Sequence, residues 1–212
     1  MSIQDSPADL PVQSSERVLT TPIFDAVEDT FAFGERGETL RRVYLRHLSA
    51  VAVLAVDEQD RVLLINQYRH PVRMKLWEIP AGLLDVDGEP MLEAAQRELA
   101  EEADLQAQTW QTLLDFYTTP GANNEAIRIY LAEGLTEVPE AERHTREAEE
   151  AEITTAWVPL AEAVQAVLSG RIHNPSAANG ILALHAVRTG AGKLRDARAP
   201  WEDHPRAAEI RP

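Results

Sequence analysis

The sequence predicts an α/β fold in which short strands are interspersed with separate helices. Two observations carry this prediction. A nearly continuous apolar run at 49–56 is typical of a buried strand, and a helical pattern follows a glycine loop at 82–105. The chain has 212 residues, of which 44% are hydrophobic and 26% charged. That length and composition suit one sizeable core with a small added subdomain.

The N-terminal part of the chain divides into a tail and a small sheet. Residues 1–16 are polar and contain Pro7 and Pro11, so we expect a flexible tail. Three strand-like pieces follow at 17–24, 29–34 and 40–47, with a glycine-containing turn at 34–37. They predict an antiparallel sheet over 17–48, ahead of the main domain.

The main domain is expected at 49–190. The buried strand at 49–56 is followed by a turn, a partner strand at 61–69 and a short strand at 76–79. Further strands fit 109–117, 125–132 and 152–158, and helices fit 160–169 and 176–189, before Gly170 and Gly190. Residues 191–212 are polar and contain proline, so we expect a C-terminal tail.

Composition excludes several classes of function. Without cysteine, the chain has no disulfide, thiolate nucleophile or thiolate-bound zinc. A formal net charge of −15 argues against general binding of nucleic acid or anionic membranes. Because it has no apolar run of about 18 residues and no signal-peptide pattern at its start, we expect a cytoplasmic protein.

The helix expected at 90–104 has two contrasting faces. An apolar stripe for burial is formed by Leu92, Ala95, Leu99 and Ala103. Successive residues turn by about 100°, so Glu98, Glu101 and Glu102 project from the other side together. Acidic runs usually form a solvated helix face. Carboxylate oxygens are also the ligands that Mg²⁺ and Mn²⁺ prefer, so a metal site is the sharper hypothesis.

This segment resembles the Nudix box. That motif is a glycine, five residues, Glu, seven residues, then Arg-Glu-aliphatic-x-Glu-Glu-x-Gly-aliphatic. Seven positions match in register: Glu89, Arg97, Glu98, Leu99, Glu101, Glu102 and Leu105. Two positions depart, because six residues separate Gly82 from Glu89 and Asp104 replaces the late glycine. Gly88 lets the longer loop turn, and Asp tolerates a left-handed conformation better than most residues, so we expect both to be structural variations.

The resemblance implies an α/β/α sandwich with a mixed sheet that holds divalent cations around a diphosphate. It makes Glu98 and Glu102 the primary metal ligands and adds the main-chain carbonyl of Ala81. Glu101 contributes a further ligand or pairs with Arg97. The cofactor is then Mg²⁺ or Mn²⁺, with two or more ions at each site.

Residues 17–190 as a whole are similar to the ADP-ribose pyrophosphatases, particularly the bacterial dimeric form. The resemblance rests on the sheet before the main domain, on the run 67–70 just before the segment 77–82, and on Pro120, fifteen residues beyond Leu105. It implies hydrolysis of ADP-ribose to AMP and ribose 5-phosphate by a homodimer. If Arg41 or Arg42 reaches the ligand of a partner subunit, the N-terminal sheet is exchanged across the dimer.

Four residues are candidates for binding the substrate. Arg69 suits a phosphate, because a guanidinium forms paired hydrogen bonds to its oxygens; the alternative is an exposed strand end. Glu78 either bonds the adenine or ribose or anchors the loop. Phe24 either stacks on the adenine, as the family implies, or packs in the core. Neighbouring strand residues face opposite ways, so only one of Arg41 and Arg42 can reach a partner's ligand, and we favour Arg42.

The general base is expected in the acidic segment 146–152, where the resemblance places it. We favour Glu150, then Glu149, with Glu152 as a further candidate metal ligand. The alternative is a solvated acidic loop. His144 lies in the same polar stretch beside Arg143, and we expect it to be a surface residue.

Three rival functions remain open. The substrate could be another nucleoside diphosphate sugar or an oxidised nucleotide. A Nudix-fold ligand sensor without catalysis is a second rival. Such a sensor would lack the metal-binding glutamates and carry a DNA-binding segment, and this sequence shows neither feature. An interaction module with an acidic helix is the third.

Overall fold

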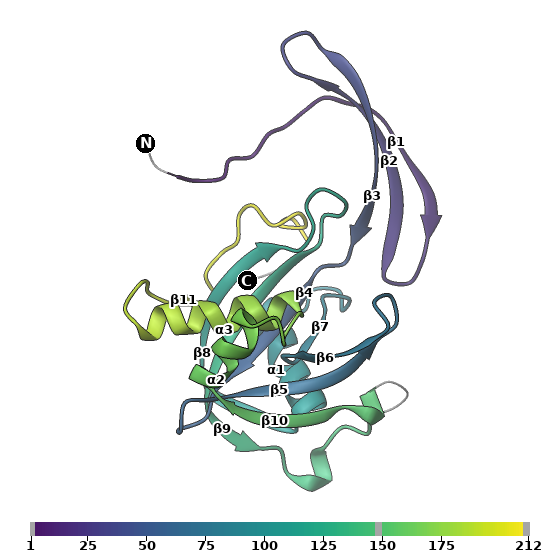
Figure 1. Ribbon diagram of the computed structural model, residues 1–212. Helices are drawn as coiled ribbons and strands as arrows, with labels where there is room; N and C mark the ends of the chain where they lie inside the picture. The colour runs from purple at the N-terminus through teal and green to yellow at the C-terminus, as the bar shows by residue number, and fades with distance from the viewer. Residues whose placement is uncertain (1–2, 147–149, 210–212) are drawn as a thin grey trace.

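The structure is a computed structural model and describes residues 3–146 and 150–209. The chain begins with an antiparallel sheet of three strands, β1 (Val12–Thr20), β2 (Phe24–Phe33) and β3 (Glu38–His47). Figure 1 shows this N-terminal sheet projecting from the rest of the molecule. β1 begins inside the expected tail, and the sequence did not reveal this because every residue of β1 is exposed. Thr21 turns the chain by hydrogen bonding to Phe24, which therefore starts β2 instead of ending β1.

The main domain is built on a mixed sheet with the strand order β11-β8-β9-β4-β7. Its strands are β4 (Ala50–Ala55), β7 (Ala81–Leu83), β8 (Leu105–Tyr117), β9 (Ala126–Glu137) and β11 (Arg195–Asp196). β4 is parallel to β9, and the other pairs are antiparallel. All six residues of β4 are buried, as the apolar run predicts. A second sheet has the order β10-β5-β6, from β5 (Arg61–Arg69), β6 (Met74–Glu78) and β10 (Thr154–Pro159).

Helices cover both faces of the mixed sheet. The alternating side chains of β4 explain this, since Ala52 and Leu54 belong to one core cluster and Val51 and Val53 to another. The first cluster includes α2 (Leu160–Leu168) and α3 (Pro175–Arg188), and the second includes α1 (Met91–Ala103). Short 3₁₀ turns lie at Glu140–Glu142 and Glu150–Glu152. The predicted α/β/α sandwich after a small antiparallel sheet is confirmed.

The C-terminal segment packs on the sheet, so the expectation of a simple tail from residue 191 was wrong for its described part. β11 pairs with β8. Arg128 is fully buried, forms a two-bond ion pair with Asp115 and donates to the carbonyl of Ala199 at 2.7 Å. Its guanidinium lies 5.6 Å from the ring centre of Trp201. The contacts of Arg128 with Ala199 and Trp201 join residues more than 70 positions apart in sequence, so no local pattern predicts them.

The loop that contains Pro120, between β8 and β9, fixes the N-terminal sheet to the mixed sheet. Leu45 donates its N–H to the carbonyl of Ala122, and Asn124 donates back to Leu45. The side chain of Asn124 accepts the N–H of His47 at 2.8 Å. No helix in the described part of the chain is long and apolar enough to cross a membrane.

Candidate active site

The box helix α1 forms because its apolar stripe faces the core. Leu92, Ala95 and Leu99 are buried against β4 and β9. Pro90 occupies the N-cap position, just outside the helix. The helix ends at Asp104, which has φ 55° and ψ 34° and is therefore left-handed. The predicted tolerance of Asp at this position is confirmed.

Two of the box glutamates are buried against the loop that precedes the helix. Glu98 is 9% exposed and Glu102 is 6% exposed. One carboxylate oxygen of Glu102 accepts the N–H of Ala81 at 2.9 Å. The carboxylate of Glu98 lies against Gly82, where a Cβ would come within 1.9 Å of its carboxyl carbon. Only glycine leaves room for this carboxylate, so the box glycine acts by its lack of a side chain.

Arg97 connects the remaining acidic side chains. Its guanidinium forms two hydrogen bonds to Glu89, at 3.0 and 3.1 Å, and one each to Glu98 at 2.5 Å and Glu101 at 3.3 Å. Glu101 therefore pairs with Arg97, one of its two expected roles. The hydrogen bonds to Glu89 raise the pKa of Arg97, although partial burial opposes this. Arg97 thus stays charged and offsets the repulsion among its carboxylates.

The carboxylate oxygens of Glu98, Glu101 and Glu102 suit a hard cation, although in this structure they bond to other groups of the protein. No three His, Asp or Glu side chains of the described residues are arranged as a ready metal site. Glu98 and Glu101 bond to Arg97, and Glu102 bonds to the N–H of Ala81. Val53 donates to the carbonyl of Pro80, so in an antiparallel pair the main-chain groups of Ala81 face away from β4, toward the helix. Two buried carboxylates and a carbonyl therefore lie around one loop, which is the oxygen chemistry that Mg²⁺ and Mn²⁺ bind.

Arg69 and Glu78 bond to each other across the β5–β6 pair. The guanidinium donates to both oxygens of Glu78, at 3.0 and 2.8 Å. The Glu78 side chain is 3% exposed, whereas that of Arg69 is 43% exposed. Glu78 therefore holds the guanidinium of Arg69, which is a contact that neither of its two expected roles included, and both roles stay predictions.

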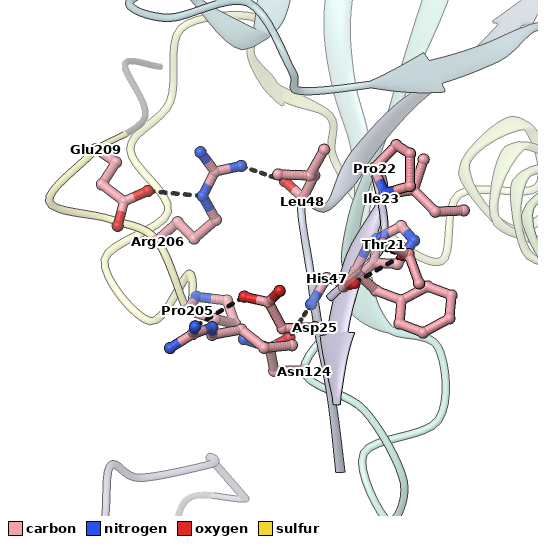
Figure 2. A pocket seen from close by; sticks show the side chains of 12 residues that line it. Thr21, Pro22, Ile23, Asp25, His47, Leu48, Asn124, Pro205, Arg206 and Glu209 are labelled. Atoms are coloured by element: carbon pink, nitrogen blue, oxygen red, sulfur yellow. Dashed lines mark hydrogen bonds and ion pairs between the residues drawn. The ribbon is translucent and has the colours of Figure 1, made fainter. Parts of the chain in front are cut away.

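Phe24 lines a cavity of about 310 Å³ between the N-terminal sheet, the Pro120 loop and the C-terminal segment. Figure 2 shows His47, Asn124 and Arg206 around it. Phe24 is half-buried, so it is not a core residue. The neighbouring Arg46 is paired with Asp25 at 2.9 Å.

Arg42 and Arg41 are both exposed on β3. Arg41 pairs with Glu28 at 2.6 Å, and Arg42 donates to the carbonyl of Arg41. Within one chain, neither is brought to the box helix.

The candidate bases lie at the border of what the structure describes. Glu149 lies outside the described residues, and Glu150 begins the 3₁₀ turn Glu150–Glu152 with no description of its side chain. Glu152 lies 3.6 Å from Lys75 in an exposed pair. His144 is exposed, as predicted.

Arg206 makes a contribution that the sequence did not indicate. Its guanidinium donates to the carbonyls of Leu48 and Leu84. These bonds join the C-terminal segment to the turn between β3 and β4 and to the loop between β7 and α1. It also pairs with Glu209 at 2.8 Å (Figure 2). An isolated arginine in a polar stretch gives no sequence signal for such a role.

Comparison with known proteins agrees with this geometry. A NUDIX domain model matches residues 46–177. The chain is 46% identical over 198 residues to an ADP-ribose pyrophosphatase of Mycobacterium tuberculosis, covering 93% of this chain and 94% of that protein. It is 33% identical over 169 residues to an ADP-ribose pyrophosphatase of Bacillus subtilis, covering 79% and 88% respectively. A crystal structure of an ADP compounds hydrolase has a TM-score of 0.63 at 24% identity, covering 89% of this chain and 100% of that one, which shows the shared fold. On the family match and these identities, the chain belongs to the NUDIX domain family.

Proposed function

We propose that this protein is a Nudix-type hydrolase that cleaves the diphosphate bond of ADP-ribose to AMP and ribose 5-phosphate. The observation that carries the proposal is the pair of buried carboxylates, Glu98 and Glu102, against the Ala81–Gly82 turn in the register of the Nudix box. The substrate is favoured by two relatives that are ADP-ribose pyrophosphatases, whose alignments cover 93% and 79% of this chain.

The reaction depends on a divalent cation, for which Glu98, Glu102 and the carbonyl of Ala81 are the proposed ligands. Mg²⁺ or Mn²⁺, with two or more ions per site, fits these oxygen donors. Such ions screen a diphosphate and lower the pKa of a bound water. Arg97 orients Glu98 and keeps Glu101 within reach of the same site.

The general base comes from the segment after residue 146, with Glu150 favoured over Glu149. The carboxylate would take a proton from the attacking water while a new P–O bond forms and the bridging P–O bond breaks. The second phosphate then leaves with the bridging oxygen. The oxygen of the attacking water ends on one of the two products, and hydrolysis in isotope-labelled water identifies which product carries it.

Arg69 and Phe24 are the proposed contacts for the rest of the substrate. The side chain of Arg69 is 43% exposed and Glu78 holds its guanidinium, which suits a contact with a phosphate oxygen. Phe24 opens onto a cavity of about 310 Å³, which suits an adenine ring.

A homodimer is also part of the proposal. The N-terminal sheet, residues 17–48 by the expected boundary, exposes large apolar side chains such as Val18, Leu19 and Val43, each more than half exposed. A second copy covering them would let the partner's Arg42 approach the substrate.

Product analysis tests the proposed function. Purified protein with Mg²⁺ should release AMP and ribose 5-phosphate from ADP-ribose, and a chelator should abolish the release until Mg²⁺ is restored. A panel of GDP-mannose, ADP-glucose and oxidised nucleoside triphosphates should give lower kcat/KM values. If any panel member gave a higher kcat/KM than ADP-ribose, that compound would be the preferred substrate and the proposal of ADP-ribose would be wrong.

A conservative substitution in the box tests the proposed metal ligands. Glu102→Gln should lower kcat by about 10³-fold, because an uncharged amide binds a cation poorly. The fold should be retained, as judged by circular dichroism. Glu162→Gln, on the exposed side of α2, removes the same charge away from the site and is the matched control. Unchanged turnover in Glu102→Gln would contradict the proposed metal site.

A further inference from the structure

Arg206 bonds to two parts of the molecule that lie far apart in sequence. Its Nη1 donates to the carbonyl of Leu48 and also to that of Leu84, and the bond to Leu48 is drawn in Figure 2. Leu48 lies in the turn that connects the N-terminal sheet to β4, and Leu84 opens the loop at 84–90 between β7 and α1, here called the box loop. One donor atom therefore bridges the N-terminal sheet and the loop of the candidate metal site.

The main chain brings the same two parts together. Leu84 donates its N–H to the carbonyl of Ser49 at 3.1 Å. Ser49 is fully buried and has a left-handed backbone, with φ 68°. Its N–H donates to Nδ1 of His47 at 3.2 Å, and its Oγ accepts the N–H of Ala126 at 3.3 Å. This turn is a fixed point of the fold, and Arg206 holds the box loop against it from the C-terminal segment.

The box loop needs such support, because it is one residue longer than the motif. Six residues rather than five separate Gly82 from Glu89. The loop borders a cavity of about 270 Å³, which Arg206 also lines, so it lacks packing contacts on that side. Leu84 follows Gly82 by two residues, and Gly82 is where the carboxylate of Glu98 finds room. A bond that fixes Leu84 therefore restrains the turn at the candidate metal site.

Arg206 is itself held by its neighbours. Its main-chain N–H donates to Nδ1 of His204 at 3.0 Å, and its Nε pairs with Glu209 at 2.8 Å. The His204 ring is buried and packs edge-on against Trp201, with 4.9 Å between the ring centres. The Arg206 side chain is 20% exposed. A planar guanidinium loses little freedom for each further hydrogen bond it makes, so it suits a rigid tie between two carbonyls.

We infer that Arg206 is a positioning residue that keeps the box loop and the N-terminal sheet in one fixed arrangement. The inference rests on the proposed function, in which ADP-ribose contacts Phe24 of the sheet and the diphosphate lies at the Ala81–Gly82 turn. A substrate held at two places is aligned for reaction only if those places keep a constant relation. An error of about 1 Å in such an alignment can cost about 10²-fold in rate.

The kinetic test uses Arg206→Met and Arg206→Lys. Methionine keeps much of the side-chain stem and removes every donor, so kcat for ADP-ribose should fall by about tenfold to a hundredfold while KM stays within about threefold. Lysine should recover part of the loss in kcat, because an ammonium group can donate to both carbonyls. A raised KM with unchanged kcat would overturn the inference, since Arg206 would then only bind substrate in the cavity beside Phe24.

Arg188→Met is the matched control. Arg188 also bridges two segments, with Asp60 at 3.3 Å and Glu133 at 2.6 Å, and both of these partners lie outside the box loop and the N-terminal sheet. This variant should keep the kcat and KM of the unmodified protein. An equal loss of kcat in Arg188→Met and Arg206→Met would overturn the inference, because the loss would then follow from removing any bridging arginine.

Amide hydrogen exchange tests the tie without any turnover. The N–H groups of Leu84 and Glu89 are bonded within the protein and report on the box loop. Peptides that span 45–52 and 83–90 should exchange faster in Arg206→Met than in the unmodified protein or Arg188→Met, whereas peptides from β5 should not change.

Unchanged exchange in both peptides, or equally faster exchange in β5, would overturn the inference whatever the substrate proves to be. Failure of the unmodified protein to release AMP would instead refute the proposed function. The exchange measurement would still decide whether Arg206 ties the box loop to the N-terminal sheet.

Discussion

Replacing Gly82 with alanine is the most informative perturbation of the box, because the structure gives the size of the clash. The new Cβ would lie 1.9 Å from the carboxyl carbon of Glu98, and 2.0 and 2.4 Å from its oxygens. Ordinary contact begins at 3.4 Å, so the carboxylate must move by about 1.5 Å. The displaced group is a proposed metal ligand.

The fold should tolerate this change. The clash involves the end of a flexible side chain rather than main-chain atoms, and Gly82 does not need the left-handed conformation that favours glycine. Alanine also lowers the entropy of the unfolded chain slightly. The melting temperature of Gly82→Ala should therefore stay within about 3 °C of the unmodified protein.

Activity should fall much further than stability. A displacement above about 1 Å predicts a loss of about 10²-fold in kcat/KM for ADP-ribose, equivalent to about 2.7 kcal/mol of transition-state stabilisation. Mn²⁺ titration followed by electron paramagnetic resonance should show weaker binding. Gly192→Ala is the control, because a Cβ there meets nothing within 4 Å. If the kcat/KM of Gly82→Ala stayed within threefold of that of the unmodified enzyme, activity would not require the Glu98 carboxylate to lie against Gly82, and the reasoning would be refuted.

Two further predictions concern buried charge. Arg69→Ala leaves Glu78 buried without its bidentate partner, so the free energy of unfolding measured in urea should fall by about 2 kcal/mol. Arg69→Lys should recover part of this loss, and no loss in Arg69→Ala would contradict a stabilising role for the pair. Burial, with Arg206 and Arg128 nearby, lowers the pKa of His204 to about 4 from 6.5. The unfolded chain therefore takes up the proton first on acidification, and stability falls as the pH drops from 6.5 toward 4. When the pH is lowered from 7 to 5, the free energy of unfolding should fall by about 2 kcal/mol more in the unmodified protein than in His204→Asn. Equal pH profiles for the two proteins would exclude the effect.

The box helix could be predicted from sequence because its signals are local. The apolar stripe, the cluster of glutamates and the left-handed Asp104 all follow from residue types at fixed spacing. The buried strand β4 is also visible, since both of its faces are covered and the whole run is apolar.

Edge strands and the C-terminal segment could not be predicted in the same way. β7 and β11 have three and two residues, too few for a periodic pattern. β1 has no buried residue, so nothing marks its beginning at Val12. The C-terminal segment is ordered by Arg128, which is remote in sequence.

Within the site, the sequence identified residue types better than their partners. It left two roles open for Glu78 and did not indicate its buried bidentate pair with Arg69. It did not indicate that Arg146 binds the C-terminal end of α1. The metal ligands, the substrate contacts and the base stay predictions.

A crystal structure with Mg²⁺ and a non-hydrolysable ADP-ribose analogue tests the central claim most directly. The account predicts a cation about 2.0–2.1 Å from carboxylate oxygens of Glu98 and Glu102 and from the carbonyl of Ala81, and also bound to the diphosphate. The N–H of Ala81 would then have released Glu102, or would share it with the cation. A diphosphate bound elsewhere, or a cation that does not contact Glu98 and Glu102, would contradict the account.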